Sequence, residues 1–282
     1  MRARQPDYRG YAVNDGVRIY YEVNGSAPGT VFFVAPHPIV HSGLWKMQVP
    51  FMARHFRVIV YDGRGNGRSD RPASGYGLEH VVGDALAVLR ELEVGRCALL
   101  TEGSASKIAA AVAARHQELV AAMVLLSPRF YGAPTLTPGG WEKWKRRYVV
   151  EFDGNVRHMM DSHFREPHST KLKEDFWGWA HDGNPQVVFT ANQELWVDAD
   201  ARPLLPGVRC PVLMIHGRQN REMPYEHSLE GQALVPDASL ITIETPGAWP
   251  AGRDPVRINL FLREFLVRHL YALSPPAAGA VS

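Results

Sequence analysis

Three side chains able to move protons or attack a carbonyl group directly follow apolar segments of the sequence. His37 follows residues 31–34, and Glu102 and Ser104 follow residues 98–101. A carboxyl group at the end of a buried strand is costly unless it is paired or used, so Glu102 is informative. With His37 it would form an acid/base pair for proton transfer, cyclisation or elimination on a bound substrate. A structural role explains His37 equally well, and Ser104 is also explained as a helix N-cap.

Short apolar or β-branched segments alternate with segments of helical periodicity. The predicted strands are residues 17–23, 31–34, 58–61, 98–101, 122–126, 212–215 and 240–243. Most of them lack polar alternation, which is typical of strands covered on both faces. Apolar spacing predicts helices over residues 82–92 and 255–270. The alternation indicates an α/β fold with a mostly parallel, doubly wound sheet, whose strand ends meet at one edge where ligands bind.

One long segment without a strand pattern interrupts this alternation. We assign residues 1–133 and 205–273 to the core and residues 134–204 to a helical lid. Asn184 before Pro185 predicts a helix start in the lid, and Ser169 or Thr170 predicts another. The lid is rich in aromatic residues, which either pack it onto the sheet or line an apolar pocket. Residues 274–282 hold few bulky apolar side chains and are predicted to be a disordered tail.

Four motifs occur in order along the chain. They are Pro36-His37-Pro38 with Trp45 after it, Asp62-Gly-Arg-Gly-Asn-Gly67, Leu100-Thr-Glu-Gly-Ser-Ala-Ser106, and His216-Gly217 with Arg253-Asp-Pro255 after it. In this order and spacing they resemble the α/β-hydrolase superfamily, and the second motif resembles a bacterial subgroup of these hydrolases. The resemblance covers nearly the whole chain and implies an α/β-hydrolase fold. The glycines of the second motif are interpreted as a tight turn and not as a dinucleotide site.

The resemblance also implies positions for a Ser-His-Asp triad, and none is filled by a residue that can perform its role. The spacing places the nucleophile position at Gly103, which has no side chain to attack a carbonyl group. The acid position corresponds to Asn220, which carries no charge, and the histidine position to Ala248. One oxyanion-hole position falls on Pro38, which has no N–H to donate. We therefore expect a degenerate triad.

A shift of one residue would make Ser104 the nucleophile. Glu102 and Ser106 would then occupy tight positions that prefer glycine. The usual loop would still supply no histidine, because none occurs between His227 and His269. The loops around the same crevice add Arg129 and Trp249 as pocket candidates beside Pro38, although a solvated arginine and a packing tryptophan explain them as well.

Charge and hydropathy exclude several classes of partner. The 282 residues include 31 Lys and Arg against 29 Asp and Glu, a net charge of +2, and no run of like charge marks a nucleic-acid or membrane surface. We expect a small apolar or aromatic organic substrate, with no nucleic acid and no membrane as partner. The chain shows no leader or spanning segment, which predicts a cytoplasmic location. The sequence leaves open whether the chain forms a homodimer.

No cofactor is expected from the residue types present. Cys97 and Cys210 fall at the starts of predicted strands, where a thiol behaves as a small hydrophobe. The lid histidines lack the spacing of two histidines and a carboxylate that holds a metal; they are His158, His163, His168 and His181.

Three functional hypotheses fit an intact fold beside a dismantled triad. The favoured one is a non-hydrolytic small-molecule enzyme, a cyclase, lyase or isomerase of specialised metabolism, in which His37 and Glu102 handle protons. The second is a catalytically silent ligand-binding or accessory pseudo-hydrolase. The third is an ester or amide hydrolase that uses Ser104.

Overall fold

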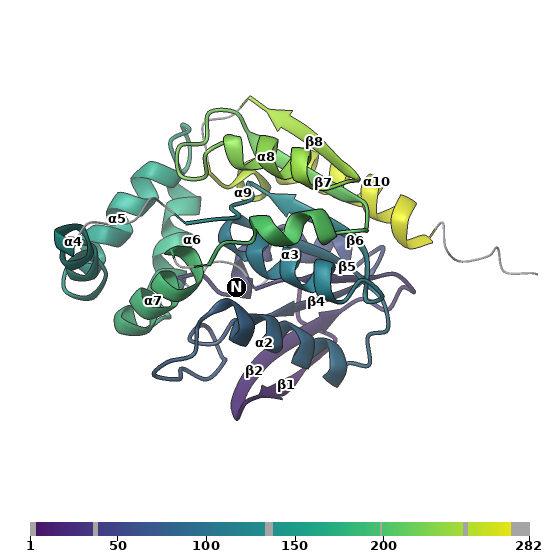
Figure 1. The fold of residues 1–282 in the computed structure, drawn as a ribbon, viewed down its shortest axis with the longest axis horizontal. Helices are drawn as coiled ribbons and strands as arrows, with labels where there is room; N and C mark the ends of the chain where they lie inside the picture. The colour runs from purple at the N-terminus through teal and green to yellow at the C-terminus, as the bar shows by residue number, and fades with distance from the viewer. Residues whose placement is uncertain (1–3, 36–38, 133–137, 198, 245–247, 272–282) are drawn as a thin grey trace, which may run out of the picture.

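The computed structural model describes residues 4–35, 39–132, 138–197, 199–244 and 248–271, and within them one eight-stranded sheet forms the centre of the molecule (Figure 1). The strands are β1 (Tyr8–Asn14), β2 (Val17–Asn24), β3 (Thr30–Phe33), β4 (Arg57–Tyr61), β5 (Cys97–Glu102), β6 (Val120–Leu126), β7 (Val212–Gly217) and β8 (Ala238–Ile243). Their order across the sheet is β1-β2-β4-β3-β5-β6-β7-β8. β2 pairs antiparallel with both β1 and β4, and the neighbours in the series β4-β3-β5-β6-β7-β8 pair in parallel. The predicted α/β architecture with a mostly parallel sheet is confirmed.

The seven predicted strand segments overlap β2 to β8, but β1 was not predicted. β1 is largely exposed and lies at the sheet edge, so it carries no apolar run. It joins β2 through Asp15 and Gly16, which both have positive φ, as in a two-residue hairpin turn. Because its side chains need not be buried, a search for apolar segments passes over it.

Helices cover both faces of the sheet (Figure 1). On one face, α2 (Leu78–Glu91), α3 (Ser106–Arg115) and α8 (Glu226–Leu234) enclose one apolar cluster. On the other face, a second cluster includes side chains of α1 (Val49–Met52), α9 (Pro250–Arg253) and α10 (Pro255–Tyr271). β6 is buried along its whole length, and β5 is buried up to Glu102. The carboxyl end of β5 therefore emerges from the middle of a rigid core.

A helical insertion, residues 138–197, separates β6 from β7. It contains α4 (Pro138–Val149), α5 (Phe152–His163), α6 (Thr170–His181), α7 (Pro185–Ala191) and a π-helical turn (Asn192–Val197). The predicted helix start at Asn184 is confirmed, since its Oδ1 accepts the amides of Gln186 and Val187 at 2.9 and 3.3 Å. α6 also begins at the predicted Thr170, although the Ser169 hydroxyl donates to the Glu166 carbonyl and does not cap the helix.

The predicted disordered tail, residues 274–282, lies outside the described residues. No helix in the described part of the chain combines the length and the apolar character needed to cross a membrane.

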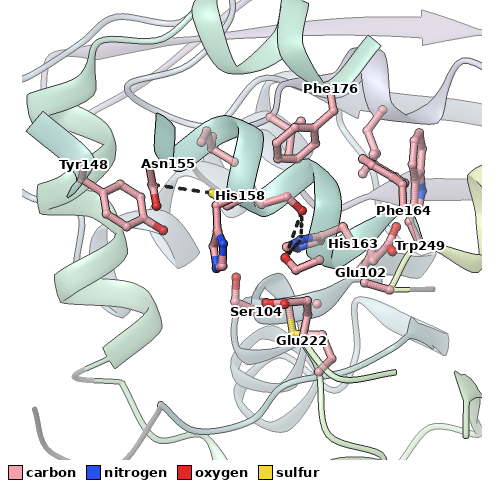
Figure 2. Close-up of a pocket in the computed structure, with 18 of the residues that line it drawn as sticks. Glu102, Ser104, Tyr148, Asn155, His158, His163, Phe164, Phe176, Glu222 and Trp249 are labelled. Atoms are coloured by element: carbon pink, nitrogen blue, oxygen red, sulfur yellow. Dashed lines mark hydrogen bonds between the residues drawn. The ribbon is translucent and has the colours of Figure 1, made fainter. Parts of the chain in front are cut away.

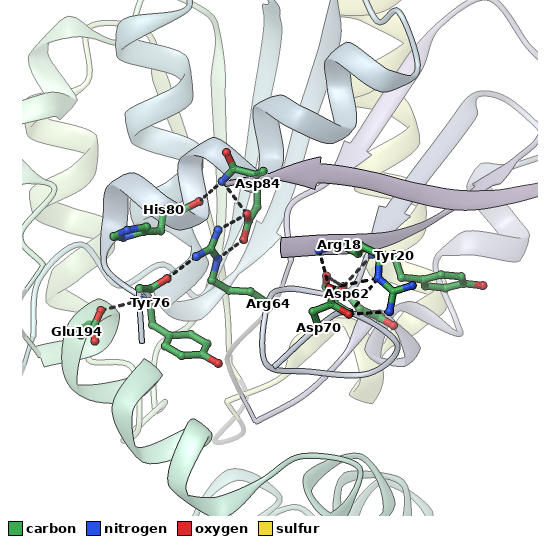
Figure 3. Close-up of polar contacts among 12 residues, drawn as sticks. Arg18, Tyr20, Asp62, Arg64, Asp70, Tyr76, His80, Asp84 and Glu194 are labelled. Atoms are coloured by element: carbon green, nitrogen blue, oxygen red, sulfur yellow. Dashed lines mark hydrogen bonds and ion pairs between the residues drawn. The ribbon is translucent and has the colours of Figure 1, made fainter. Parts of the chain in front are cut away.

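The glycine-rich turn after β4 is fixed by buried hydrogen bonds (Figure 3). Asp62 accepts the amides of Ser42 and Arg68 at 3.0 and 2.9 Å. Arg64 donates two hydrogen bonds to Asp84 of α2, at 2.7 and 2.6 Å. Gly67 has a φ of 50°, and a Cβ there would collide with the Asp62 carboxylate, so only glycine fits. These contacts give the turn a structural role.

Candidate active site

A cavity of about 200 Å³ lies at the carboxyl end of β5, between the sheet and the helical insertion (Figure 2). Apolar and aromatic side chains form most of its wall, including Leu44, Tyr148, Phe164, Phe176 and Trp249. Its groups that could handle protons are Glu102, Ser104, His158, His163 and Glu222. An apolar cavity with a few convergent polar groups is the usual form of a small-molecule site.

Glu102 is the last residue of β5 and lines this cavity. Its Oε2 atom is buried and has no hydrogen-bond partner among the described residues. Burial raises the pKa of this carboxyl group well above its usual value of 4.5, because the charged form loses its hydration. The shift favours the protonated form, which can donate a hydrogen bond or a proton to a bound molecule.

Ser104 follows Glu102 by two residues, just after the end of β5. Gly103 has a φ of 61° and turns the chain from β5 into the short 3₁₀ helix η2 (Gly103–Ala105), which leads into α3. The Ser104 hydroxyl is buried against the cavity, and no described residue hydrogen-bonds to it. A buried hydroxyl without a partner is destabilising, so its presence here is explained if a bound molecule completes its hydrogen bonds.

Two imidazoles reach the cavity from α5. Figure 2 shows the ring of His158 directed toward Ser104. His163 ends the helix, and its Nδ1 lies 2.8 Å from the Met159 carbonyl oxygen. Burial lowers the pKa of His163, while the charge of the Glu222 carboxylate acts in the opposite direction. The net shift favours a neutral imidazole, which is the form that accepts a proton.

Comparison with known proteins identifies the family. The family described as the alpha/beta hydrolase fold matches residues 35–252. The chain belongs to this family. Among curated proteins, 2-hydroxymuconate semialdehyde hydrolase of Pseudomonas sp. (strain CF600) is 26% identical over 255 residues, covering 86% of this chain and 85% of the relative. A 2-hydroxy-6-oxo-2,4-heptadienoate hydrolase of Pseudomonas putida is 28% identical over 236 residues, covering 80% of this chain and 81% of its own length.

Solved structures agree on the architecture. The enol-lactonase of Burkholderia xenovorans LB400 superposes with a TM-score of 0.82 at 21% identity, covering 92% of this chain and 100% of that structure. At this identity the likeness shows the α/β-hydrolase fold alone.

Two of the three positions that family resemblance assigns to the triad line the cavity, and the third does not. Gly103 and Ala248 both line it. Asn220 does not line it, and its side-chain oxygen accepts the backbone amides of Glu222 and Met223 at 3.1 and 3.0 Å. The asparagine thus shapes the loop after β7. This loop contributes Glu222, two residues after Asn220, and Met223 to the cavity lining.

The remaining predicted site residues have different outcomes. His37 and Pro38 lie outside the described residues. Trp249 lines the cavity, and its ring packs 5.5 Å from that of Trp179, centroid to centroid. Arg129 is not one of the residues that line this cavity. It is buried, and its Nη2 donates to the Glu222 carbonyl oxygen at 3.0 Å, so its guanidinium is used to hold backbone.

Sequence reasoning missed three of the groups in the cavity: His158, His163 and Glu222. The lid histidines were considered only as metal ligands, and spacing along the chain does not show which face of α5 turns toward the sheet. A signal for Glu222 was available, since it lies two residues from the expected acid position.

Ionisable groups outside the cavity are mostly accounted for by packing. His216 is buried, and its two ring nitrogens lie 2.7 Å from the Ser228 hydroxyl and 2.8 Å from the Met223 carbonyl oxygen. Burial lowers its pKa to about 4. Cys97 and Cys210 are buried, and burial raises the pKa of both thiols. Over the described residues, no three His, Cys, Asp or Glu side chains are grouped so as to hold a metal ion.

Proposed function

We propose that the protein hydrolyses an ester or amide bond in a small, largely apolar substrate, with Ser104 as the nucleophile. The observation that carries the proposal is the Ser104 hydroxyl, which is buried at the cavity and unpaired among the described residues. The names of the full-length relatives, which are hydrolases, favour hydrolysis over the cyclase, lyase or isomerase preferred on sequence grounds. The apolar and aromatic wall supports a substrate of matching character.

The reaction requires a nucleophile, a base and a group that stabilises the developing oxyanion. The Ser104 oxygen bonds to the carbonyl carbon while a base removes its proton, and the leaving group departs with a proton. Water then attacks the acyl-enzyme carbonyl, and the acid product leaves as the Ser104 hydroxyl re-forms.

Glu102 is the group that we assign to the carbonyl oxygen. One amide donor of the usual oxyanion hole is missing, because the residue at that position is Pro38 and proline has no N–H in any conformation. A protonated Glu102, favoured by the raised pKa of its buried carboxyl group, can donate a hydrogen bond in its place. One such donor is worth roughly 3 to 4 kcal/mol of transition-state stabilisation.

The proposal is tested by hydrolysis of 4-nitrophenyl butyrate. Ser104→Ala is expected to lower kcat by about 1000-fold or more, since loss of a nucleophile leaves only residual catalysis. Ser106→Ala is the matched control, because the Ser106 hydroxyl is also buried and has no hydrogen-bond partner in the described part of the chain, but Ser106 does not line the cavity. If Ser104→Ala hydrolyses the ester as fast as the parent protein, Ser104 is not the nucleophile.

A second candidate is proton-transfer chemistry without a covalent intermediate, as in a cyclase, lyase or isomerase. The Oε2 of Glu102, unpaired among the described residues, specifically favours it, since a buried protonated acid and a neutral imidazole in the same cavity can serve as an acid/base pair. Glu102→Gln would then abolish turnover while Ser104→Ala would retain it. Loss of turnover in Ser104→Ala supports the hydrolase, in which Glu102→Gln also lowers activity because it alters the donor to the carbonyl oxygen.

A further inference from the structure

The proposed reaction needs a base, and the usual loop does not provide one. Ala248 occupies the position implied for the histidine, and its methyl group cannot take a proton. The imidazoles that line the cavity within the described residues, His158 and His163, both come from α5 of the helical insertion. Among the described residues, an imidazole that serves as the base therefore comes from the helical insertion.

We propose that His163 is the general base of this site and that the Glu222 carboxylate stabilises its protonated form. The inference rests on the proposed function because it takes Ser104 as the nucleophile. The arrangement of His163 and Glu222 at the cavity does not depend on that assignment. In this arrangement the base has moved from the position of Ala248 to the end of α5, and the acid has moved from the position of Asn220 to Glu222.

Backbone contacts place His163 beside the vacant histidine position. The Ala248 amide donates to the His163 carbonyl oxygen at 3.2 Å, which ties the end of α5 to the loop before α9. The ring of His163 packs against Phe176, with centroids 5.9 Å apart, and against Phe164 at 6.3 Å. Packing on these sides holds the imidazole at the cavity wall, where a base is required.

Hydrogen bonding also fixes the tautomer that a base needs. Nδ1 of His163 faces the Met159 carbonyl oxygen at 2.8 Å, and a carbonyl oxygen only accepts hydrogen bonds. Nδ1 therefore carries the proton in the neutral ring, and the lone pair is on Nε2. His158 is exposed and has no comparable contact that selects its tautomer within the described residues.

Glu222 is positioned by its own backbone. Its amide donates to Asn220 Oδ1 at 3.1 Å, and its carbonyl oxygen accepts from Arg129 Nη2 at 3.0 Å. These contacts direct the loop so that the Glu222 side chain lines the cavity with His163. The negative charge of the Glu222 carboxylate favours the imidazolium ion that forms when His163 accepts a proton.

Other charged groups act on the same imidazole. Arg129 and His158 oppose its protonation, Glu222 favours it, and Glu102 lies in the same cavity. Burial is the largest influence and lowers the pKa of His163. The resting imidazole is neutral, takes the proton of the nucleophile on Nε2, and returns it to the leaving group.

His163→Asn tests the base because it removes Nε2 but keeps a side-chain N–H near the Met159 carbonyl. On 4-nitrophenyl butyrate we expect kcat to fall by about 100-fold or more, with little change in KM. The acidic limb of the pH-rate profile should disappear. His181→Gln is the matched control, since His181 also places Nδ1 2.8 Å from the carbonyl four residues earlier but does not line the cavity.

An NMR titration of the histidines tests the pair without any substrate. Glu222→Gln is expected to lower the pKa of His163, because it removes the charge that favours the imidazolium form. Glu226→Gln, on the exposed start of α8, should leave the pKa unchanged. An unchanged His163 pKa in Glu222→Gln would overturn the pairing, even if the parent protein hydrolyses no ester.

The kinetic outcomes separate this inference from the proposed function. If Ser104→Ala is inactive but His163→Asn keeps both its kcat and its acidic limb, the nucleophile stands and the base assignment is wrong. If His163→Asn is inactive while Ser104→Ala retains turnover, the base stands and the nucleophile is wrong. Circular dichroism of each variant establishes that the fold is retained.

Discussion

Two buried polar regions of this α/β-hydrolase family member differ in how their hydrogen bonds are satisfied (Figures 2 and 3). The first region, the turn cluster, is formed by the glycine-rich turn after β4 and Asp84 of α2. In it, Arg64 donates to both carboxylate oxygens of Asp84 and to the Gly75 carbonyl oxygen. At the cavity, Glu102 Oε2 and the Ser104 hydroxyl have no partner among the described residues. Satisfied polar groups stabilise a fold, whereas unsatisfied ones lower stability and are available to a ligand. The first region is structural and the second is the candidate site.

The largest effect on stability is expected from breaking the turn cluster. The side chains of Arg64 and Asp84 are 2% and 1% exposed. Asp84→Ala leaves the guanidinium buried without its carboxylate, which costs about 3 to 5 kcal/mol of unfolding free energy. Urea denaturation measures it, and Glu264→Ala, which breaks the exposed pair with Arg268, should cost at most about 0.5 kcal/mol. Equal losses in the two variants would refute the contrast.

A smaller effect is expected at the turn between the two active-site candidates. Gly103→Ala forces a residue with a Cβ into a φ of 61°, which costs roughly 1 to 2 kcal/mol. The added Cβ would lie 3.3 Å from Met223 Cε, the end of a flexible side chain that can move. Gly95→Ala is the control, because no atom lies within 4 Å of its added Cβ and its φ is not positive. A Gly103→Ala variant as stable as the Gly95→Ala variant would show that the turn from β5 into η2 is not strained by a Cβ at position 103.

The smallest expected change in unfolding free energy is a gain in stability and not a loss. Glu102→Gln is expected to raise the unfolding free energy at pH 7 by roughly 0.5 to 2 kcal/mol while lowering activity, as at other sites where function opposes stability. The folded-state pKa of Glu102 is raised above 4.5. The parent protein therefore loses stability relative to the variant as pH rises from 4.5 toward that pKa. Below pH 4.5 the two proteins should converge; a difference that is constant with pH would exclude a buried carboxyl group as its cause.

Much of the fold and part of the site follow from the sequence. Apolar runs locate β2 to β8, because most of these strands are buried, whether parallel or antiparallel, and carry continuous apolar residues. The same logic places Glu102 and Ser104 at a strand end that opens into the cavity. Gly103 has the positive φ expected of a chain turning sharply from strand to helix.

Long-range docking could not be predicted in the same way. His163 reaches the site because α5 folds back onto the loop at Ala248, a contact between segments far apart in the chain. Neither residue carries a local signal of the other. Arg129 shows the same limit, since only the structure reveals that its guanidinium is used by the Glu222 carbonyl.

The most direct test of the central claim is intact-protein mass spectrometry after incubation with a fluorophosphonate probe. The parent protein and Ser106→Ala should each gain the mass of one phosphonyl group, and Ser104→Ala should gain none. This result would establish a reactive hydroxyl at the cavity. A folded parent protein that stays unlabelled, or a Ser104→Ala variant that is labelled as fully as the parent, would contradict the account.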